Sequence, residues 1–88
     1  MDIYQISVRE SSGDPAVGWQ ASVAKQYVLK GAKSSVALGE SEFYATKEQA
    51  WESIQKRVEK LDFVNDEVNF NREKVNSYDE VQQKVEEL

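Results

Sequence analysis

The chain has 88 residues, of which 40% are hydrophobic and 31% charged, and its formal net charge is −5. This length allows one small domain, over residues 1–88, with the composition of an ordinary folded protein rather than of a disordered tail. Because the sequence contains neither Cys nor His, it excludes disulfide scaffolds, Cys and His zinc sites, cysteine nucleophiles and His-dependent catalytic triads.

The first residues, Met1 to Gln5, contain neither a basic segment nor the apolar run of a signal peptide. A transmembrane helix requires about 18 consecutive apolar residues, and every apolar stretch of this sequence is much shorter. We therefore expect a cytoplasmic protein that does not associate with membranes.

Residues 1–10 alternate between apolar and polar side chains, with Tyr4, Ile6 and Val8 on one side. A period of two predicts a half-buried strand. The turn-forming run from Ser11 to Pro15 predicts a chain reversal. Alternation returns from Trp19 to Leu29 and predicts a second strand.

Lys25 interrupts the apolar side of this second strand. Either its aliphatic stem crosses the rim of the sheet, or a bulge near Ala24 shifts the register. The sequence leaves both open, and it also leaves open whether Trp19 and Tyr27 are core residues or exposed.

Gly31 lies among polar residues and predicts a hairpin tip over residues 30–33. A third strand is expected within residues 35–45. Its apolar residues change parity between Leu38 and Phe43, so we predict a bend or bulge near Gly39.

Thr46 and Gln49 form a capping box that predicts a helix from about Lys47 to Leu61. Its apolar residues recur at helical spacing along one face. We expect this face to bury Trp51, Ile54 and Val58 against the sheet.

The Asn-rich segment after this helix contains Val68 and Phe70, which predict either a short edge strand or an extended loop over residues 68–70. Ser77 and Glu80 form a second capping box and predict a short helix from about Tyr78 to Leu88. Tyr78, Val81, Val85 and Leu88 would share its apolar face.

The resulting order is strand, strand, strand, helix, optional strand, helix. Short sequential connections favour antiparallel pairing. The predicted fold class is therefore α+β: an antiparallel sheet of three strands, or four with residues 68–70, packed against one long helix in two layers, with a second short C-terminal helix.

Carboxylates are the remaining catalytic or metal-binding candidates. Asp62, Asp66 and Glu67 cluster after the long helix, but their spacing differs from that of a calcium-binding loop. The four Gly residues lie too far apart for a phosphate-binding loop. We therefore predict no metal site, no cofactor and no enzymatic activity.

Charge is unevenly distributed along the chain. Residues 1–46 carry a net charge of −1 and residues 47–88 one of −4, while the stretch from Pro15 to Gly39 contains three Lys and no acidic residue. Lys25, Lys30 and Lys33 are therefore the candidate interaction surface.

Three functions are compatible with these features. The first is a small non-enzymatic accessory or protein-interaction domain, with another protein as partner and a homodimer through the terminal helix or an edge strand as a further option. The second is a weak nucleic-acid or anion binder that uses the 19–33 hairpin, where Trp19 and Tyr27 accompany the lysines. The third is a carboxylate-dependent enzyme.

Overall fold

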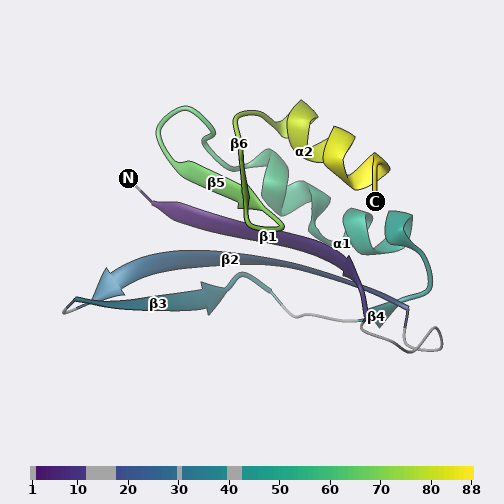
Figure 1. Ribbon diagram of the computed structural model, residues 1–88, viewed down its shortest axis with the longest axis horizontal. Coiled ribbons are helices and arrows are strands. Elements are labelled where there is room, and N and C mark those ends of the chain that lie inside the picture. Colours follow the sequence, from purple (N-terminus) through teal and green to yellow (C-terminus); the bar gives the residue numbers. More distant parts are fainter. Residues whose placement is uncertain (1, 12–17, 30, 40–42) are drawn as a thin grey trace.

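A mixed sheet with both helices on one face forms the fold (Figure 1). The computed structural model describes residues 2–11, 18–29, 31–39 and 43–88, with the backbone alone for Val28, Leu29 and Lys33. The elements are β1 (Ile3–Glu10), β2 (Trp19–Leu29), β3 (Ala32–Ala37), β4 (Phe43–Tyr44), α1 (Lys47–Glu59), β5 (Glu67–Phe70), β6 (Glu73–Val75) and α2 (Tyr78–Glu86). The strand order is β3-β2-β1-β5-β6, with β4 paired to β2.

The α+β class is observed, but the predicted antiparallel sheet of three or four strands on one long helix is wrong. The described strands form a six-stranded sheet in which β1 and β5 are parallel. Helix α1 carries the chain back to the end of the sheet where β1 starts, so the next strand runs in the same direction as β1. Residues 68–70 are therefore part of an internal strand, between β1 and β6, and not an edge strand.

The β1–β2 register settles the position of Lys25. Pairing runs without interruption from Ile3 opposite Gln26 to Glu10 opposite Trp19, so no bulge occurs near Ala24. Lys25 lies opposite Tyr4, and its Nζ is 3.4 Å from a carboxylate oxygen of Asp2. The prediction of a stem at the rim of the sheet is the correct alternative.

The third predicted strand is divided into β3 and β4, which lie along the same edge of β2. Ala37 is opposite Ala24, and Phe43 is opposite Gln20. From Ala37 to Phe43 the chain therefore advances by six residues, while the paired part of β2 spans only four. The prediction of a bend near Gly39 is confirmed, and the φ of +100° at Gly39 is one that side chains disfavour.

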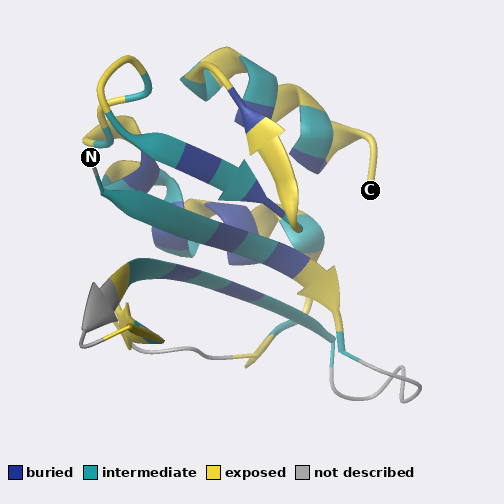
Figure 2. Ribbon diagram, turned by 60° about the vertical axis from the view of Figure 1, so that its left-hand side comes forward, coloured by how far each residue is buried: buried dark blue, intermediate teal, exposed yellow. Residues whose placement is uncertain are grey.

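The core lies between the sheet and the helices. Buried positions alternate along β1, β2 and β5 (Figure 2), as expected for strands with one covered face. Trp51, Ile54 and Val58 are buried, as predicted. Leu88 differs from the prediction because it is 45% exposed and lies after the last turn of α2.

Both helices begin at the predicted caps. The Thr46 hydroxyl accepts from the Gln49 amide and the Ser77 hydroxyl from the Glu80 amide. The Glu80 carboxylate in turn accepts from the Asn76 amide, one residue before the cap. Neither helix of the described chain is long and apolar enough to cross a membrane.

An ion pair between Glu73 and Lys84 joins β6 to α2, with 2.7 Å between Nζ and Oε2. The hydrogen bond from Lys84, and then its charge, lower the pKa of Glu73 below its ordinary value of 4.5. The same hydrogen bond raises the pKa of Lys84.

We expect this pair to make stability depend on pH. A carboxylate whose pKa is lower in the folded state stabilises the fold fully above the unfolded value of 4.5, and the effect disappears as pH falls through the lowered pKa. Wild type should therefore be more stable than Glu73→Gln at neutral pH and equal to it in strong acid, measured by urea unfolding. Glu59→Gln, an exposed control on α1, should change stability by less than about 0.5 kcal/mol.

Candidate functional site

The structure does not gather the three predicted lysines into one described cluster. Lys25 points to the helix side of the sheet and pairs with Asp2. Lys30 lies outside the described residues, and only the backbone of Lys33 is described, opposite Val28 in the β2–β3 hairpin.

The two aromatic residues of the hairpin have different environments. Trp19 is partly buried and packs against the core, whereas Tyr27 is 40% exposed. Only one of the two aromatic rings is therefore accessible beside the lysine-bearing segment. This weakens the case for base stacking, which usually uses several accessible rings.

Strand β3 forms one edge of the sheet. Within the described chain it pairs only with β2. The Leu38 amide donates to the Val23 carbonyl at 2.7 Å. Because alternate residues of an antiparallel strand direct both backbone groups to the partner, Lys33, Ser35 and Ala37 direct theirs away from β2. No other described strand pairs with these three outward backbone positions, so another strand can be added there.

None of the described elements covers the sheet face opposite the helices, and this face is polar. On β1, Gln5, Ser7 and Arg9 alternate with the buried Ile6 and Val8. The described residues of this face on the neighbouring strands include Ser22, Gln26, Ser35, Asn69 and Lys74. The aromatic side chains of β1 and β2 belong to the other face, since Tyr4 and Trp19 pack on the core.

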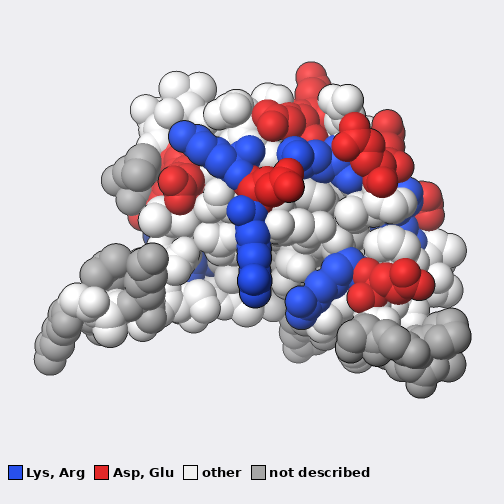
Figure 3. All heavy atoms as spheres, viewed as in Figure 1, with Lys and Arg blue, Asp and Glu red and all other residues white. Residues whose placement is uncertain are grey.

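Acidic side chains are unevenly distributed over the molecule. Figure 3 shows them mainly over the helical half, where basic side chains lie among them, and shows fewer acidic side chains over the strand half. On the open sheet face, the described charged residues are Arg9, Arg72, Lys74 and Glu67. Glu67 lies opposite Ile3, at the other end of β1 from Arg9. The face is therefore locally basic although the chain is acidic.

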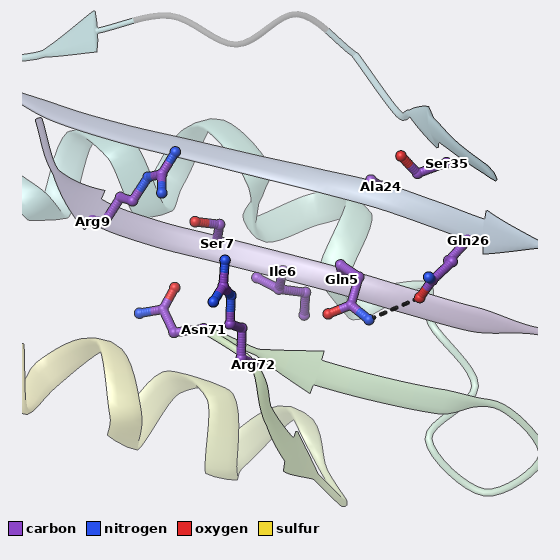
Figure 4. A pocket seen from close by; sticks show the side chains of 9 residues that line it. All are labelled: Gln5, Ile6, Ser7, Arg9, Ala24, Gln26, Ser35, Asn71 and Arg72. Carbon is purple, nitrogen blue, oxygen red and sulfur yellow. Dashed lines mark hydrogen bonds between the residues drawn. The ribbon is translucent and has the colours of Figure 1, made fainter. Parts of the chain in front are cut away.

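A hollow of about 550 Å³ lies on this open face (Figure 4). Arg9 extends from β1, and Arg72 extends from the β5–β6 turn toward Ser7. At the end of the hollow away from Arg9, the Gln5 side-chain amide nitrogen donates to the Gln26 side-chain amide oxygen at 3.2 Å. Among the described residues neither arginine forms an ion pair. Both guanidinium groups are thus available for an external anion.

Asn71 fixes the turn that carries Arg72. Its backbone amide donates to the Ile6 carbonyl at 2.8 Å. Its side-chain amide accepts from the Val8 N–H at 3.1 Å and donates to the Val8 carbonyl at 3.0 Å. The side chain therefore continues the parallel β1–β5 pairing beyond the end of β5, and it holds the turn against β1.

Arg72 adopts a backbone conformation that favours glycine. Asn71 and Arg72 have φ values of 47° and 71°, which is typical of a type I′ hairpin turn. Asn tolerates this region well, but Arg does not. Strained residues of this kind are concentrated at functional positions.

We expect Arg72→Gly to stabilise the protein by about 0.5–1 kcal/mol, because relief of the left-handed strain exceeds the added flexibility of glycine. Thermal unfolding followed by circular dichroism measures this difference. Arg72→Ala, which keeps the strain and removes the charge, is the matched control and should leave the stability nearly unchanged. A lower midpoint for the glycine variant would contradict the argument.

The predicted carboxylate cluster does not form a common site. Asp62 accepts three hydrogen bonds within its own turn, and the one from the Asn65 side chain contributes most to lowering its pKa. Asp66 accepts from the Asp2 amide at 3.0 Å. No group of three potential metal ligands occurs in the described part of the chain. Asp62 therefore stabilises its own turn, and Asp66 binds the backbone just before the start of β1.

Sequence reasoning missed the arginines and Asn71. Arg9 occupies one of the alternating polar positions of β1. The alternation alone does not indicate whether another element covers the polar face of the sheet. Asn71 is a typical first residue of a type I′ turn. It lies between two short strand-like segments, one with Val68 and Phe70 and the other with Glu73 and Val75. The usual second residue is Gly, and its replacement by Arg72 hid the hairpin.

No family model, curated protein or solved structure matches the chain. Inferences about function therefore depend on the geometry of the molecule.

Proposed function

We propose that this chain is a small, non-enzymatic, cytoplasmic protein-interaction domain that binds an extended acidic segment of another protein along β3. The observation that carries the proposal is the open edge of β3, where Lys33, Ser35 and Ala37 direct their backbone groups outward. An extended peptide can add a strand at such an edge, with main-chain hydrogen bonds providing the affinity.

The side chains of β3 support strand addition. Ala32, Ser35, Val36 and Ala37 are exposed, and the Val36 side chain is 48% exposed. Small residues leave room for a partner strand at the usual spacing, and Val36 offers it one apolar contact. Protein edges are normally protected by charges, bulges or covering elements.

Charge favours an acidic partner over a second copy of this chain. The segment from Pro15 to Gly39 contains three Lys and no acidic residue. Two copies paired through β3 would place two such positively charged segments side by side, and their charges would repel each other. An acidic segment would instead be attracted to this edge.

The test uses a fluorescein-labelled peptide of alternating Val and Glu, with a peptide of alternating Val and Lys as control. We expect the acidic peptide to bind more tightly in fluorescence anisotropy. Binding should also protect the Ser35 and Ala37 amides from hydrogen exchange, because these amides would donate to the added strand. Amides that already donate to β2 should change little.

A proline variant separates strand addition from general charge attraction. Ser35→Pro removes an outward N–H and leaves the ladder to β2 intact, since proline is tolerated where the N–H faces solvent. It should abolish peptide binding, whereas Ser35→Ala should retain it. Equal binding of both peptides, tighter binding of single-stranded RNA, or dimerisation through β3 in sedimentation would overturn the proposal.

A further inference from the structure

The hollow on the open sheet face has two chemically different ends. Arg9, Ser7 and Arg72 lie at one end, whereas Gln5, Gln26 and Ser35 lie at the other (Figure 4). Strand β1 sets this order, because Gln5, Ser7 and Arg9 follow one another at alternate positions on the same face. The hollow therefore has a cationic end and an uncharged hydrogen-bonding end.

From this arrangement we infer that the hollow is a binding site for a small hydroxylated phosphate monoester of the sugar-phosphate class. Two guanidinium groups match the nearly two negative charges that a phosphate monoester carries at neutral pH. Each guanidinium can donate two parallel hydrogen bonds to phosphate oxygens. A single carboxylate would leave one of the two positive charges without a partner.

The amide end of the hollow suits hydroxyl groups. The hydrogen bond from Gln5 to Gln26 uses one donor and one acceptor. It leaves the Gln26 amide nitrogen as a donor and the Gln5 amide oxygen as an acceptor, and a hydroxyl group uses both. A nucleobase fits less well, because the described residues that line the hollow include no aromatic ring for stacking.

Local charge and backbone conformation agree with an anion at the cationic end. Arg9 and Arg72 have no acidic partner among the described residues, and Glu67 lies at the far end of β1. Arg72 occupies a positive φ at which glycine would be more stable. The Asn71 side chain holds this unfavourable turn on β1, and the turn directs the arginine into the hollow.

The test is a titration of the isotope-labelled protein with glucose 6-phosphate, followed by amide chemical shifts at low salt. We expect saturable shifts at Ser7, Arg9 and Gln26, with tighter binding than for inorganic phosphate, glucuronate or glucose. No saturation at millimolar glucose 6-phosphate would overturn the inference. Glucuronate binding as tight as that of the sugar phosphate would also overturn it.

Variants distinguish a built site from general attraction. Arg9→Gln and Arg72→Gly should each weaken binding about tenfold or more, the loss expected for one charge-assisted contact. Arg72→Gly should not unfold the protein, so its loss of binding cannot reflect a lost fold. Lys74→Gln removes a charge from the same face outside the hollow and should change affinity less than about twofold. An equal effect of Lys74→Gln would overturn the inference.

This site does not depend on strand addition at β3. Ala37→Pro removes another outward N–H of β3 and lies outside the hollow, so it should weaken binding of the acidic peptide and leave the residues that line the hollow unchanged. Loss of either activity therefore leaves the other measurable in the same protein.

Discussion

Trp51→Ala is expected to reduce the free energy of unfolding by about 3–5 kcal/mol, the range for removing a large buried aromatic side chain. Trp51 is 7% exposed, and its ring centroid lies 5.9 Å from that of Tyr78. The substitution removes packing between α1 and the sheet together with the contact to the start of α2. Urea unfolding followed by circular dichroism measures the loss.

The control for this substitution is Glu52→Ala, the next residue of α1. Glu52 is exposed, so its replacement should change stability by less than about 0.5 kcal/mol. A small domain has only about 5–15 kcal/mol in total, and the tryptophan variant should therefore be close to unfolded at physiological temperature. Equal unfolding midpoints for both variants would contradict the observed orientation of α1.

Asn71→Ala is expected to cost about 2–5 kcal/mol. The change removes two hydrogen bonds to the Val8 backbone, each worth about 0.5–1.5 kcal/mol. It also places alanine at a φ of 47°, where the left-handed conformation costs about 1–2 kcal/mol. Urea unfolding gives the total. Faster hydrogen exchange of the Val8 amide identifies the lost contact.

Asn71→Gly separates the two contributions. Glycine accepts the positive φ but makes no side-chain hydrogen bonds. Its cost should lie between wild type and Asn71→Ala, at about 1–3 kcal/mol for two hydrogen bonds. If the glycine variant were as stable as wild type, the side-chain bonds to Val8 would contribute nothing to the hairpin.

Local patterns were sufficient for several elements. The alternation around Ile6 and Val8 predicted β1, and the spacing of Trp51, Ile54 and Val58 predicted the buried face of α1. Thr46 and Ser77 located both helix starts, because a capping hydroxyl bonds to an amide only three residues away. These features depend on interactions between residues close in the chain.

The order of the strands could not be predicted in this way. Pairing of β1 with β5 joins Ile3 to Glu67 and Ile6 to Phe70. Such contacts depend on where α1 delivers the chain, and nothing in the short sequence around Val68 specifies a parallel neighbour. Short connections do join antiparallel neighbours from β1 to β3 and between β5 and β6, whereas β1 and β5 are parallel and are separated by a long stretch of chain that includes α1.

The candidate binding surfaces show the same division. The sequence by itself determined that Arg9 lies on the polar side of a strand and that the 15–39 segment is basic. Only the tertiary structure decided that both described helices pack on the other side of the sheet, that Arg72 reaches the polar side from a distant turn, and that β3 is an edge. Residue type and period set which way a side chain points, whereas exposure and proximity depend on which elements the whole chain packs against each face.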